Sequence, residues 1–150
     1  MKIIEDIEQL RQPCKDVKTV EEGEEIGQLL LRVLSGCDNG VGLAANQIGI
    51  QKRVCVIKVN DPMVLVNPKI ISKFKKINCV EACLSFPGDY IITERYANIM
   101  VKADNHEETL IFSQDKNLLE CVCVQHEIDH LNSVTMFDRV TKENNIAKEG

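Results

Sequence analysis

The sequence predicts an α+β fold with antiparallel sheets, and the order of its predicted elements is the reason. One helical pattern lies near the start of the chain and a second lies near its end. The residues between them read as short strands that follow one another without intervening helices. An alternating βαβ fold needs a helix between successive strands, so this order favours the α+β class.

The first predicted helix begins with a capping box. Thr19-Val20-Glu21-Glu22 has the spacing in which the threonine and the glutamate satisfy free backbone N–H groups. Apolar residues then recur at helical spacing, at Val20, Ile26, Leu29, Leu30, Val33 and Leu34. The pattern ends near Ser35-Gly36. We expect a packing helix that takes no part in chemistry.

The middle of the chain is predicted to be extended. Its segments are rich in β-branched residues and are bounded by turn residues such as Pro68. The predicted strands are Arg53–Val59, Met63–Val66, Lys69–Val80, Ile91–Ile92, Ile99–Lys102 and Thr109–Phe112. A second helix is expected over about Asn117–Asn132. These elements predict one catalytic domain over residues 1–140 and a short polar tail over residues 141–150.

Composition indicates an ordinary globular chain. The 150 residues are 44% hydrophobic and 27% charged, and the formal net charge is -5. A nucleic-acid partner is not expected, because such a partner needs a basic surface. The first six residues turn acidic before an apolar signal core can form, and no apolar run reaches the length of a membrane span. We therefore expect a cytoplasmic protein whose seven cysteines are reduced.

The most informative motif is His126-Glu127-Ile128-Asp129-His130, an H-E-x-x-H element that follows the apolar run 118–124. Positions four apart lie on one helix face, so His126 and His130 can offer two imidazole nitrogens to one metal ion. Glu127 lies close enough to act on a water that the metal activates. The chain has three histidines and places two of them here. Hydrolysis by a metal-activated water is therefore the first hypothesis.

A catalytic metal site of this kind needs a third protein ligand. Cys123 shares a face with His126 but lies a turn away, so we expect it to line the adjoining pocket. Cys121 points elsewhere on the helix. Cys83 lies in the irregular segment Glu81–Gly88, where a thiolate on a turn is able to meet the helix. A half-buried free cysteine is the alternative for that residue.

Gly40–Gln47 is the third unusual segment. Its two glycines and two alanines expose backbone and allow the close approach of another chain. A phosphate loop is an alternative, although no Gly-Lys-Ser/Thr follows, and a plain turn after the first helix is another. Gln47 at its end is a candidate amide donor to a developing oxyanion.

These three segments together resemble the peptide deformylase family, whose enzymes remove the formyl group from the first methionine of new proteins. The family motifs G-φ-G-φ-A-A-x-Q, E-G-C-L-S and Q-H-E-x-D-H match Gly40–Gln47, Glu81–Ser85 and Gln125–His130 in that order. Weaker similarities are Leu10-Arg11, Asn67-Pro68, Arg95 and Phe137-Asp138-Arg139. The resemblance implies antiparallel sheets packed around a central metal-binding helix.

The resemblance also implies a metal site and a mechanism. Cys83, His126 and His130 would bind one divalent ion, with Fe²⁺ as the native metal and Zn²⁺, Ni²⁺ or Co²⁺ as substitutes. Glu127 would take a proton from the attacking water and return it to the leaving amine. The side chain of Gln47 and the backbone N–H of Leu84 would help the metal to hold the oxyanion.

The resemblance further implies how the substrate binds. The methionine side chain would enter an apolar pocket, and the extended peptide would pair with the backbone of the cleft like an added strand. The implied substrate-binding residues are Val41, Gly42, Glu81, Ala82, Leu119, Val122 and Cys123. The implied partners are N-formylmethionyl nascent peptides, near the ribosome and without direct binding to nucleic acid or membrane. The protein is expected to be a monomer.

Two departures from the family pattern stand out. Ala82 occupies the position of the second motif where glycine is usual, so one extra methyl lies beside the substrate. The sequence also ends soon after Arg139, which resembles the short forms of the family that lack a C-terminal helix. Two other readings stay open, a different H-E-x-x-H peptidase and a catalytically decayed metal-binding or ribosome-associated module.

Overall fold

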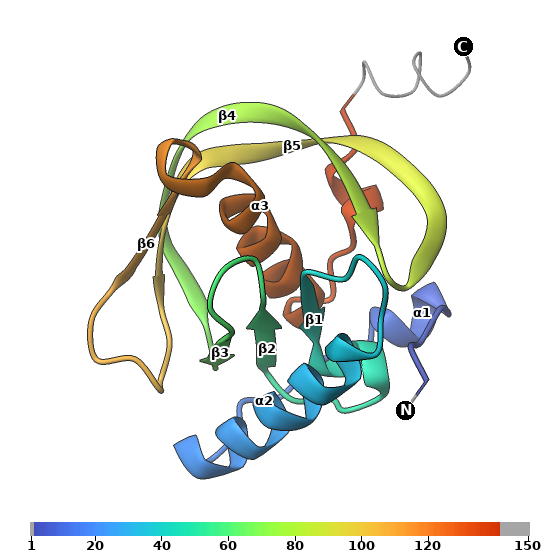
Figure 1. Cartoon of the computed structure of the whole chain (residues 1–150), viewed down its shortest axis with the longest axis vertical. Helices are drawn as coiled ribbons and strands as arrows, with labels where there is room; N and C mark the ends of the chain where they lie inside the picture. Colours follow the sequence, from blue (N-terminus) through green and yellow to red (C-terminus); the bar gives the residue numbers. More distant parts are fainter. Residues whose placement is uncertain (1, 142–150) are drawn as a thin grey trace.

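The computed structural model describes residues 2–141 and contains two three-stranded antiparallel sheets with helices packed against them. Figure 1 shows the sheets on either side of one long helix. The elements are α1 (Ile7–Leu10), α2 (Val20–Ser35), β1 (Gly42–Ala44), η1 (Ala45–Ile48), β2 (Val54–Ile57), β3 (Met63–Val66), β4 (Lys69–Cys83), β5 (Phe86–Lys102), β6 (Leu110–Ser113), α3 (Gln114–Leu131) and η2 (Met136–Arg139). The predicted α+β class is confirmed.

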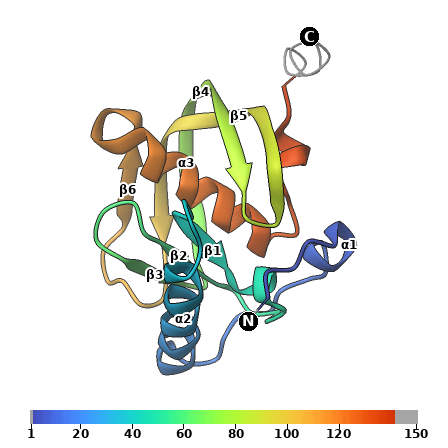
Figure 2. The same cartoon turned by 45° about the vertical axis from the view of Figure 1, so that its right-hand side comes forward.

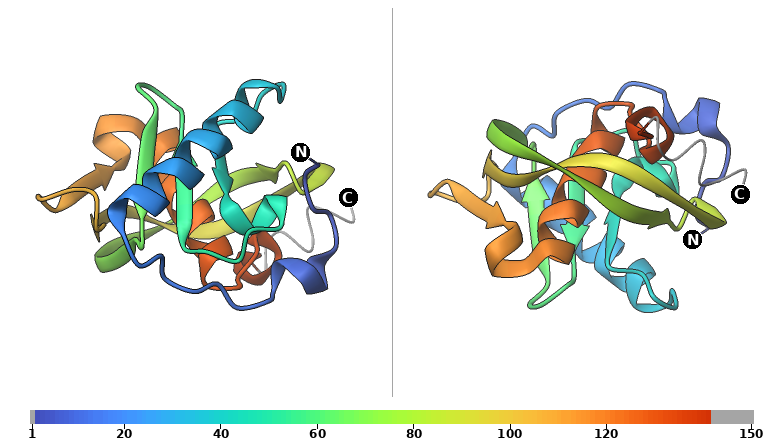
Figure 3. Two further views of the ribbon diagram at one scale, coloured as in Figure 1. Left: turned by 90° about the horizontal axis from the view of Figure 1, so that it is seen from below. Right: turned by 90° about the horizontal axis from the view of Figure 1, so that it is seen from above.

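The first sheet has the strand order β1-β2-β3, and α2 covers one of its faces. Figure 3, in the view from below, shows α2 crossing the three strands. The helix comes close because it carries glycine at the crossing: a Cβ on Gly27 would lie 2.4 Å from Cγ1 of Val64. The threonine half of the predicted capping box is present, since the Thr19 hydroxyl accepts the N–H of Glu22 at 3.1 Å. This helix is confirmed as a packing element.

The second sheet has the order β4-β5-β6 and arches over α3. The prediction of two short strands at Ile91–Ile92 and Ile99–Lys102 is wrong in one respect, because both belong to the 17-residue strand β5. The charged residues between these two segments interrupt the apolar pattern, so the sequence does not predict one continuous strand. Buried Arg95 faces partners inside the protein, while exposed Glu94 points outward. The strand therefore alternates normally through a segment that is not apolar.

Helix α3 lies between the two sheets, as Figure 2 shows from a second direction. Its first turn breaks at Asn117, whose φ of -168° and ψ of 104° are not helical. The Asn117 side chain accepts the N–H of Glu120 at 3.0 Å, so the regular helix starts where the sequence predicts it to start. All residues from Cys121 to Leu131 are buried. The helix can bury polar residues because polar groups inside the protein bond to them, as Glu81 does to His126 and Arg95 does to Asp129.

The Gly40–Gln47 segment differs from its prediction. Its residues from Gly42 onward form β1 and the start of η1, and Ala44 and Ala45 are fully buried instead of exposing backbone. The close approach is made by α3: a Cβ on Gly42 would lie 2.6 Å from Sγ of Cys123 and 2.8 Å from Oε2 of Glu127. The glycine therefore brings this strand against the helix that carries the metal motif.

Besides β1 and η1, the short elements α1 and η2 were not predicted. Both are single turns, too short to produce a helical period in the sequence. The predicted polar tail lies outside the described residues from residue 142 onward. Within residues 2–141, no helix is long and apolar enough to cross a membrane.

Candidate metal centre

Three potential metal ligands meet between α3 and the end of β4. His126 and His130 lie one turn apart on α3, with ring centroids 5.0 Å apart. Cys83 is the last residue of β4, and its Sγ lies 3.4 Å from Nε2 of His130. One ligand atom from each of these three residues falls within 4.8 Å of the others, and all three residues are buried. The structure thus brings together the residues that the sequence predicts as ligands.

The other ring nitrogen of His126 is held by a carboxylate. Nδ1 of His126 lies 2.7 Å from Oε1 of Glu81, which leaves Nε2 to face the site. Glu81 also accepts hydrogen bonds from the Thr93 hydroxyl and, at 2.5 and 2.9 Å, from the Arg95 guanidinium. Hydrogen bonds from the histidine and the arginine hold the pKa of Glu81 well below its usual range, against the opposing effect of burial. A histidine held in this way is the usual arrangement around a protein-bound metal.

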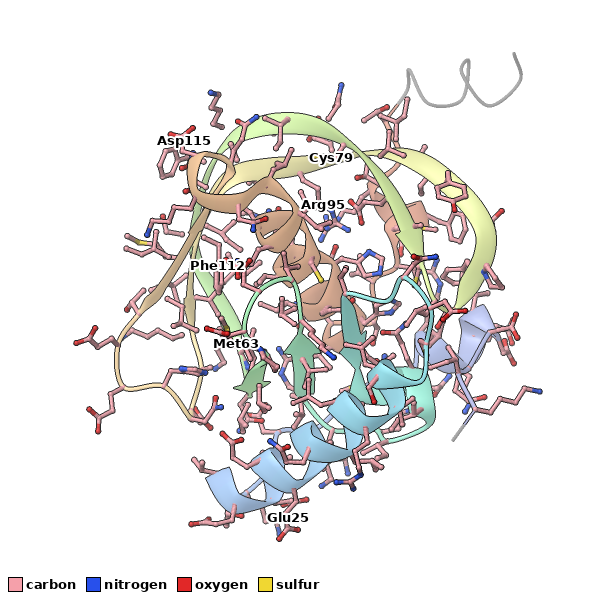
Figure 4. The ribbon with its side chains drawn as sticks, in the orientation of Figure 1. Glu25, Met63, Cys79, Arg95, Phe112 and Asp115 are labelled. Carbon is pink, nitrogen blue, oxygen red and sulfur yellow. The ribbon has the colours of Figure 1, made fainter. Side chains whose placement is uncertain are left out.

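Arg95 extends this network across the protein. Figure 4 labels its side chain between the β4–β5 arch and α3. Its guanidinium reaches Glu81 on one side and, at 2.5 Å, Oδ2 of Asp129 on the other. Asp129 is also bound by Arg139 at 2.9 and 3.0 Å. The buried charges are therefore paired and hydrogen-bonded, which is the condition under which burial is tolerated.

The donor set suits a divalent transition-metal ion. One thiolate and two imidazoles are ligands for Zn²⁺ and for Fe²⁺, Co²⁺ or Ni²⁺, and three protein ligands leave a coordination position for water or substrate. Burial together with the neighbouring charges of His126 and Arg95 lowers the pKa of His130 well below its usual value, so this ring is neutral as a ligand must be. The residues present therefore fit one bound ion.

His126 has a different electrostatic environment. Burial alone lowers its pKa, but the charge of Glu127 and hydrogen bonds to Cys83 and Glu81 raise it well above the usual value. A proton held on this ring leaves when a metal ion takes the nitrogen.

Glu127 follows His126 directly on α3, is 4% exposed and faces the backbone of Gly42. Burial raises its pKa to about 7, and the charge of His126 opposes that rise. A carboxyl group with a pKa near neutrality is suited to accept a proton and return it. One of its oxygens, Oε1, has no hydrogen-bond partner among the described residues.

The side chain of Gln47 is directed at the same place. Its Oε1 accepts the N–H of Ala44 at 2.9 Å, which fixes the orientation of the amide. Its Nε2 therefore points toward Ser85 Oγ at 3.1 Å and Cys83 Sγ at 3.6 Å. An oriented N–H beside a metal ligand is able to donate to an oxygen bound there.

A cleft of about 560 Å³ opens onto this cluster. It is lined by the predicted substrate residues Val41, Gly42, Glu81, Ala82, Leu119, Val122 and Cys123, together with Cys83, Leu84, His126 and Glu127. The carboxylate of Glu81 is engaged by His126, Thr93 and Arg95, so its part in holding a substrate stays a prediction. The Cys123 thiol lies 3.6 Å from the Val41 carbonyl and outside the ligand cluster, which agrees with its predicted place in the pocket wall.

Sequence reasoning missed the residues that support the site from behind. Thr93, Ser85, Asp129 and Asn46 had been given no role, and Arg95 was noticed only through the family resemblance. Single polar residues inside strands and loops carry no spacing that marks their partners. Three-dimensional contacts are needed to find them.

Comparison with known proteins gives a consistent result. A sequence profile described as polypeptide deformylase matches residues 2–145. The peptide deformylase of Hydrogenovibrio crunogenus is 37% identical over 141 residues, which cover 89% of this chain and 81% of that protein. Peptide deformylase 2 of Vibrio cholerae is 38% identical over 133 residues, covering 86% and 79%.

A solved structure agrees with the fold. The crystal structure of a peptide deformylase from Synechococcus elongatus in complex with actinonin superposes with a TM-score of 0.83 at 36% identity. The match covers 99% of this chain and 83% of that one. Similarity therefore extends over both sheets and the helix between them.

Proposed function

Since the chain belongs to the peptide deformylase family and is a metal-dependent hydrolase of formylated nascent peptides, we propose that Cys83, His126 and His130 are its metal ligands. The observation that carries the proposal is the meeting of a thiol and two imidazoles at one end of a cleft. Residues 47 positions apart in the sequence contribute to it. Both rings are carried by one helix and Glu81 holds that of His126, so they need little rearrangement to bind an ion.

The ion supplies Lewis-acid chemistry when bound: it lowers the pKa of a water and polarises the formyl carbonyl. We propose Fe²⁺ as the resident ion, as the family resemblance implies. We propose Zn²⁺, Ni²⁺ or Co²⁺ as substitutes, because this mixed sulfur and nitrogen donor set accepts all four.

Glu127 is the proposed general base and then general acid. Its carboxylate takes a proton from the attacking water while the water oxygen bonds to the formyl carbon. The same group then gives that proton to the amide nitrogen as the carbon–nitrogen bond breaks. Formate and a free methionine amine leave. Burial, which raises the pKa of this carboxyl group, helps one group to do both steps near neutral pH.

Gln47 and Leu84 are proposed to stabilise the oxyanion. The Gln47 amide is already turned toward Cys83, and Leu84 follows that cysteine directly in the chain. Donors fixed before the reaction cost no reorganisation when negative charge develops on the formyl oxygen.

The cleft walls are proposed to hold the substrate. Val41, Leu119, Val122 and Cys123 would enclose the methionine side chain. The backbone at Gly42 and Ala82 would pair with the extended peptide from two sides, because one residue belongs to β1 and the other to the end of β4. These walls are apolar with few charges, as a methionine pocket requires.

We further propose that residues 1–140 act as one catalytic domain, as a monomer, in the cytoplasm and transiently near the ribosome. The net charge of -5 supports a protein that does not bind nucleic acid directly.

Hydrolysis of formyl-Met-Ala-Ser tests the function. We expect release of formate from this peptide and no cleavage of the same peptide without its formyl group. Cleavage of an internal peptide bond would indicate a different H-E-x-x-H peptidase. A metal-loaded protein inactive on both peptides would indicate a decayed module.

Ala82 gives a prediction about specificity. It lies at a register irregularity between Glu81 and Cys83, is exposed on the cleft, and has a backbone conformation open to any L-residue. Its methyl group narrows the cleft beside the bound peptide. We expect Ala82→Gly to raise kcat/KM more for formyl-Met-Leu or formyl-Met-Phe peptides than for formyl-Met-Ala, by on the order of 1 kcal/mol or less. Equal effects on the three peptides would show that this methyl group does not shape specificity.

A further inference from the structure

Asn46 lies directly before Gln47, at the start of η1, and packs against the end of α3. The residue is fully buried. Its Nδ2 donates to the backbone carbonyl of His130 at 2.8 Å and to that of Leu10 at 3.2 Å. The family motif leaves this position open, and nothing in the proposed reaction uses it.

The orientation of the Asn46 amide is fixed by these two contacts. Turning the amide over would place its oxygen against two carbonyl oxygens, which are acceptors only. Oδ1 therefore points away from both. It is buried and has no hydrogen-bond partner among the described residues. A buried acceptor without a donor is rare enough in native proteins to need an explanation.

His130 has the complementary need. Its Nε2 faces Cys83 Sγ at 3.4 Å, so Nδ1 is the nitrogen turned away from the ligand cluster. A neutral imidazole that offers Nε2 to a metal carries its proton on Nδ1 and needs an acceptor there. The equivalent atom of His126 meets Glu81, whereas Nδ1 of His130 is buried without a partner among the described residues.

We infer that Asn46 is a positioning residue for the proposed metal ligand His130, with Asn46 Oδ1 accepting the Nδ1–H of the ring through one bridging water. One amide then holds the ligand by its backbone carbonyl and by its ring. The bond fixes the tautomer that presents Nε2 to the metal. The inference rests on the proposed metal site.

Metal affinity is the first measurement. We expect Asn46→Ala to weaken Zn²⁺ binding by about 10–100-fold in competition with a chromophoric chelator, as loss of an outer hydrogen bond to a ligand usually does. Asn67→Ala is the matched control. That buried amide ties down Val17 at 2.9 and 3.0 Å and lies in another part of the molecule. It should lose stability and keep its zinc affinity.

Asn46→Asp separates positioning from general support of the fold. The aspartate keeps an acceptor for Nδ1–H but loses the donor to the two carbonyl groups. Its stability in chemical denaturation should fall at least as far as that of Asn46→Ala, while its zinc affinity should stay closer to that of the parent. Zinc affinity that falls in step with stability in Asn46→Ala, Asn46→Asp and Asn67→Ala would reduce Asn46 to a structural role.

The unmodified protein provides a test that needs no variant to fold. In the zinc-loaded chain, NMR should detect a slowly exchanging Nδ1 proton on His130 with a nuclear Overhauser contact to the Asn46 side chain. A rapidly exchanging proton, or proton attachment to Nε2, would overturn the inference. A Cys83→Ala variant that binds zinc as tightly as the parent would refute the metal site itself.

Discussion

Replacing Cys83 by alanine is expected to abolish tight metal binding and to reduce deformylation to background. The thiolate is the proposed ligand from outside α3, and its loss leaves the two imidazoles of a single helix turn. We expect the affinity for Zn²⁺ or Fe²⁺ to fall by more than the roughly 10–100-fold that follows loss of an outer partner. Metal analysis after dialysis, together with formate release from formyl-Met-Ala-Ser, measures both effects.

Cys123→Ala is the matched control for this variant. Cys123 is also a buried cysteine of the same cleft, but its thiol meets the Val41 carbonyl instead of the ligand cluster. It should keep the metal and lose only part of its affinity for the methionine side chain. Full metal occupancy in Cys83→Ala, together with a metal-free Cys123→Ala, would reverse the ligand assignment.

If iron is the working ion, activity should also decline in air as Fe²⁺ and the Cys83 thiolate oxidise.

The two long helices could be predicted because each carries its own signal. A capping box and an apolar stripe mark α2, and the spacing of His126 and His130 marks the metal-binding face of α3. These signals are local, so they depend on no knowledge of the rest of the fold.

The strands were less accessible from the sequence. Strand β1 consists of Gly42, Leu43 and Ala44, which have little β propensity, and it exists because α3 and β2 pack against it. Strand β5 passes through polar residues that are buried by ion pairing. Tertiary contacts determine both strands, and such contacts produce no periodic pattern of residues in the sequence.

The proposed metal site could also be predicted only in part from the sequence. Two ligands follow from one helix turn, but the choice of Cys83 from seven cysteines depended on a motif resemblance. Its meeting with His130 across 47 residues is a property of the arch formed by β4 and β5 over α3. The support given by Glu81, Arg95 and Asp129 could be found only in the structure, because each partner lies on a different element.

Glu127→Gln is expected to retain fold and metal while losing about 10²–10⁴-fold in kcat, the usual contribution of general acid–base catalysis. Glutamine preserves the size of the side chain but cannot accept the proton of the attacking water. Burial of a neutral amide is easier than burial of a carboxylate, so the variant should be no less stable in urea than the parent. Steady-state formate release and metal analysis on the same preparation separate the rate effect from a loss of metal.

Glu120→Gln serves as the control for charge. Glu120 lies on α3 two turns before Glu127 and is only half-buried, so the variant removes one negative charge from the same helix without entering the ligand cluster. Its kcat should stay within about twofold of the parent, because surface substitutions away from a site usually have small effects.

If Glu127→Gln behaved like Glu120→Gln, the proton would have to move through another group. Glu81 is a poor candidate for that group, because its carboxylate is already bonded to His126, Thr93 and Arg95. A rate drop confined to Glu127→Gln would therefore identify the base by both its chemistry and its position.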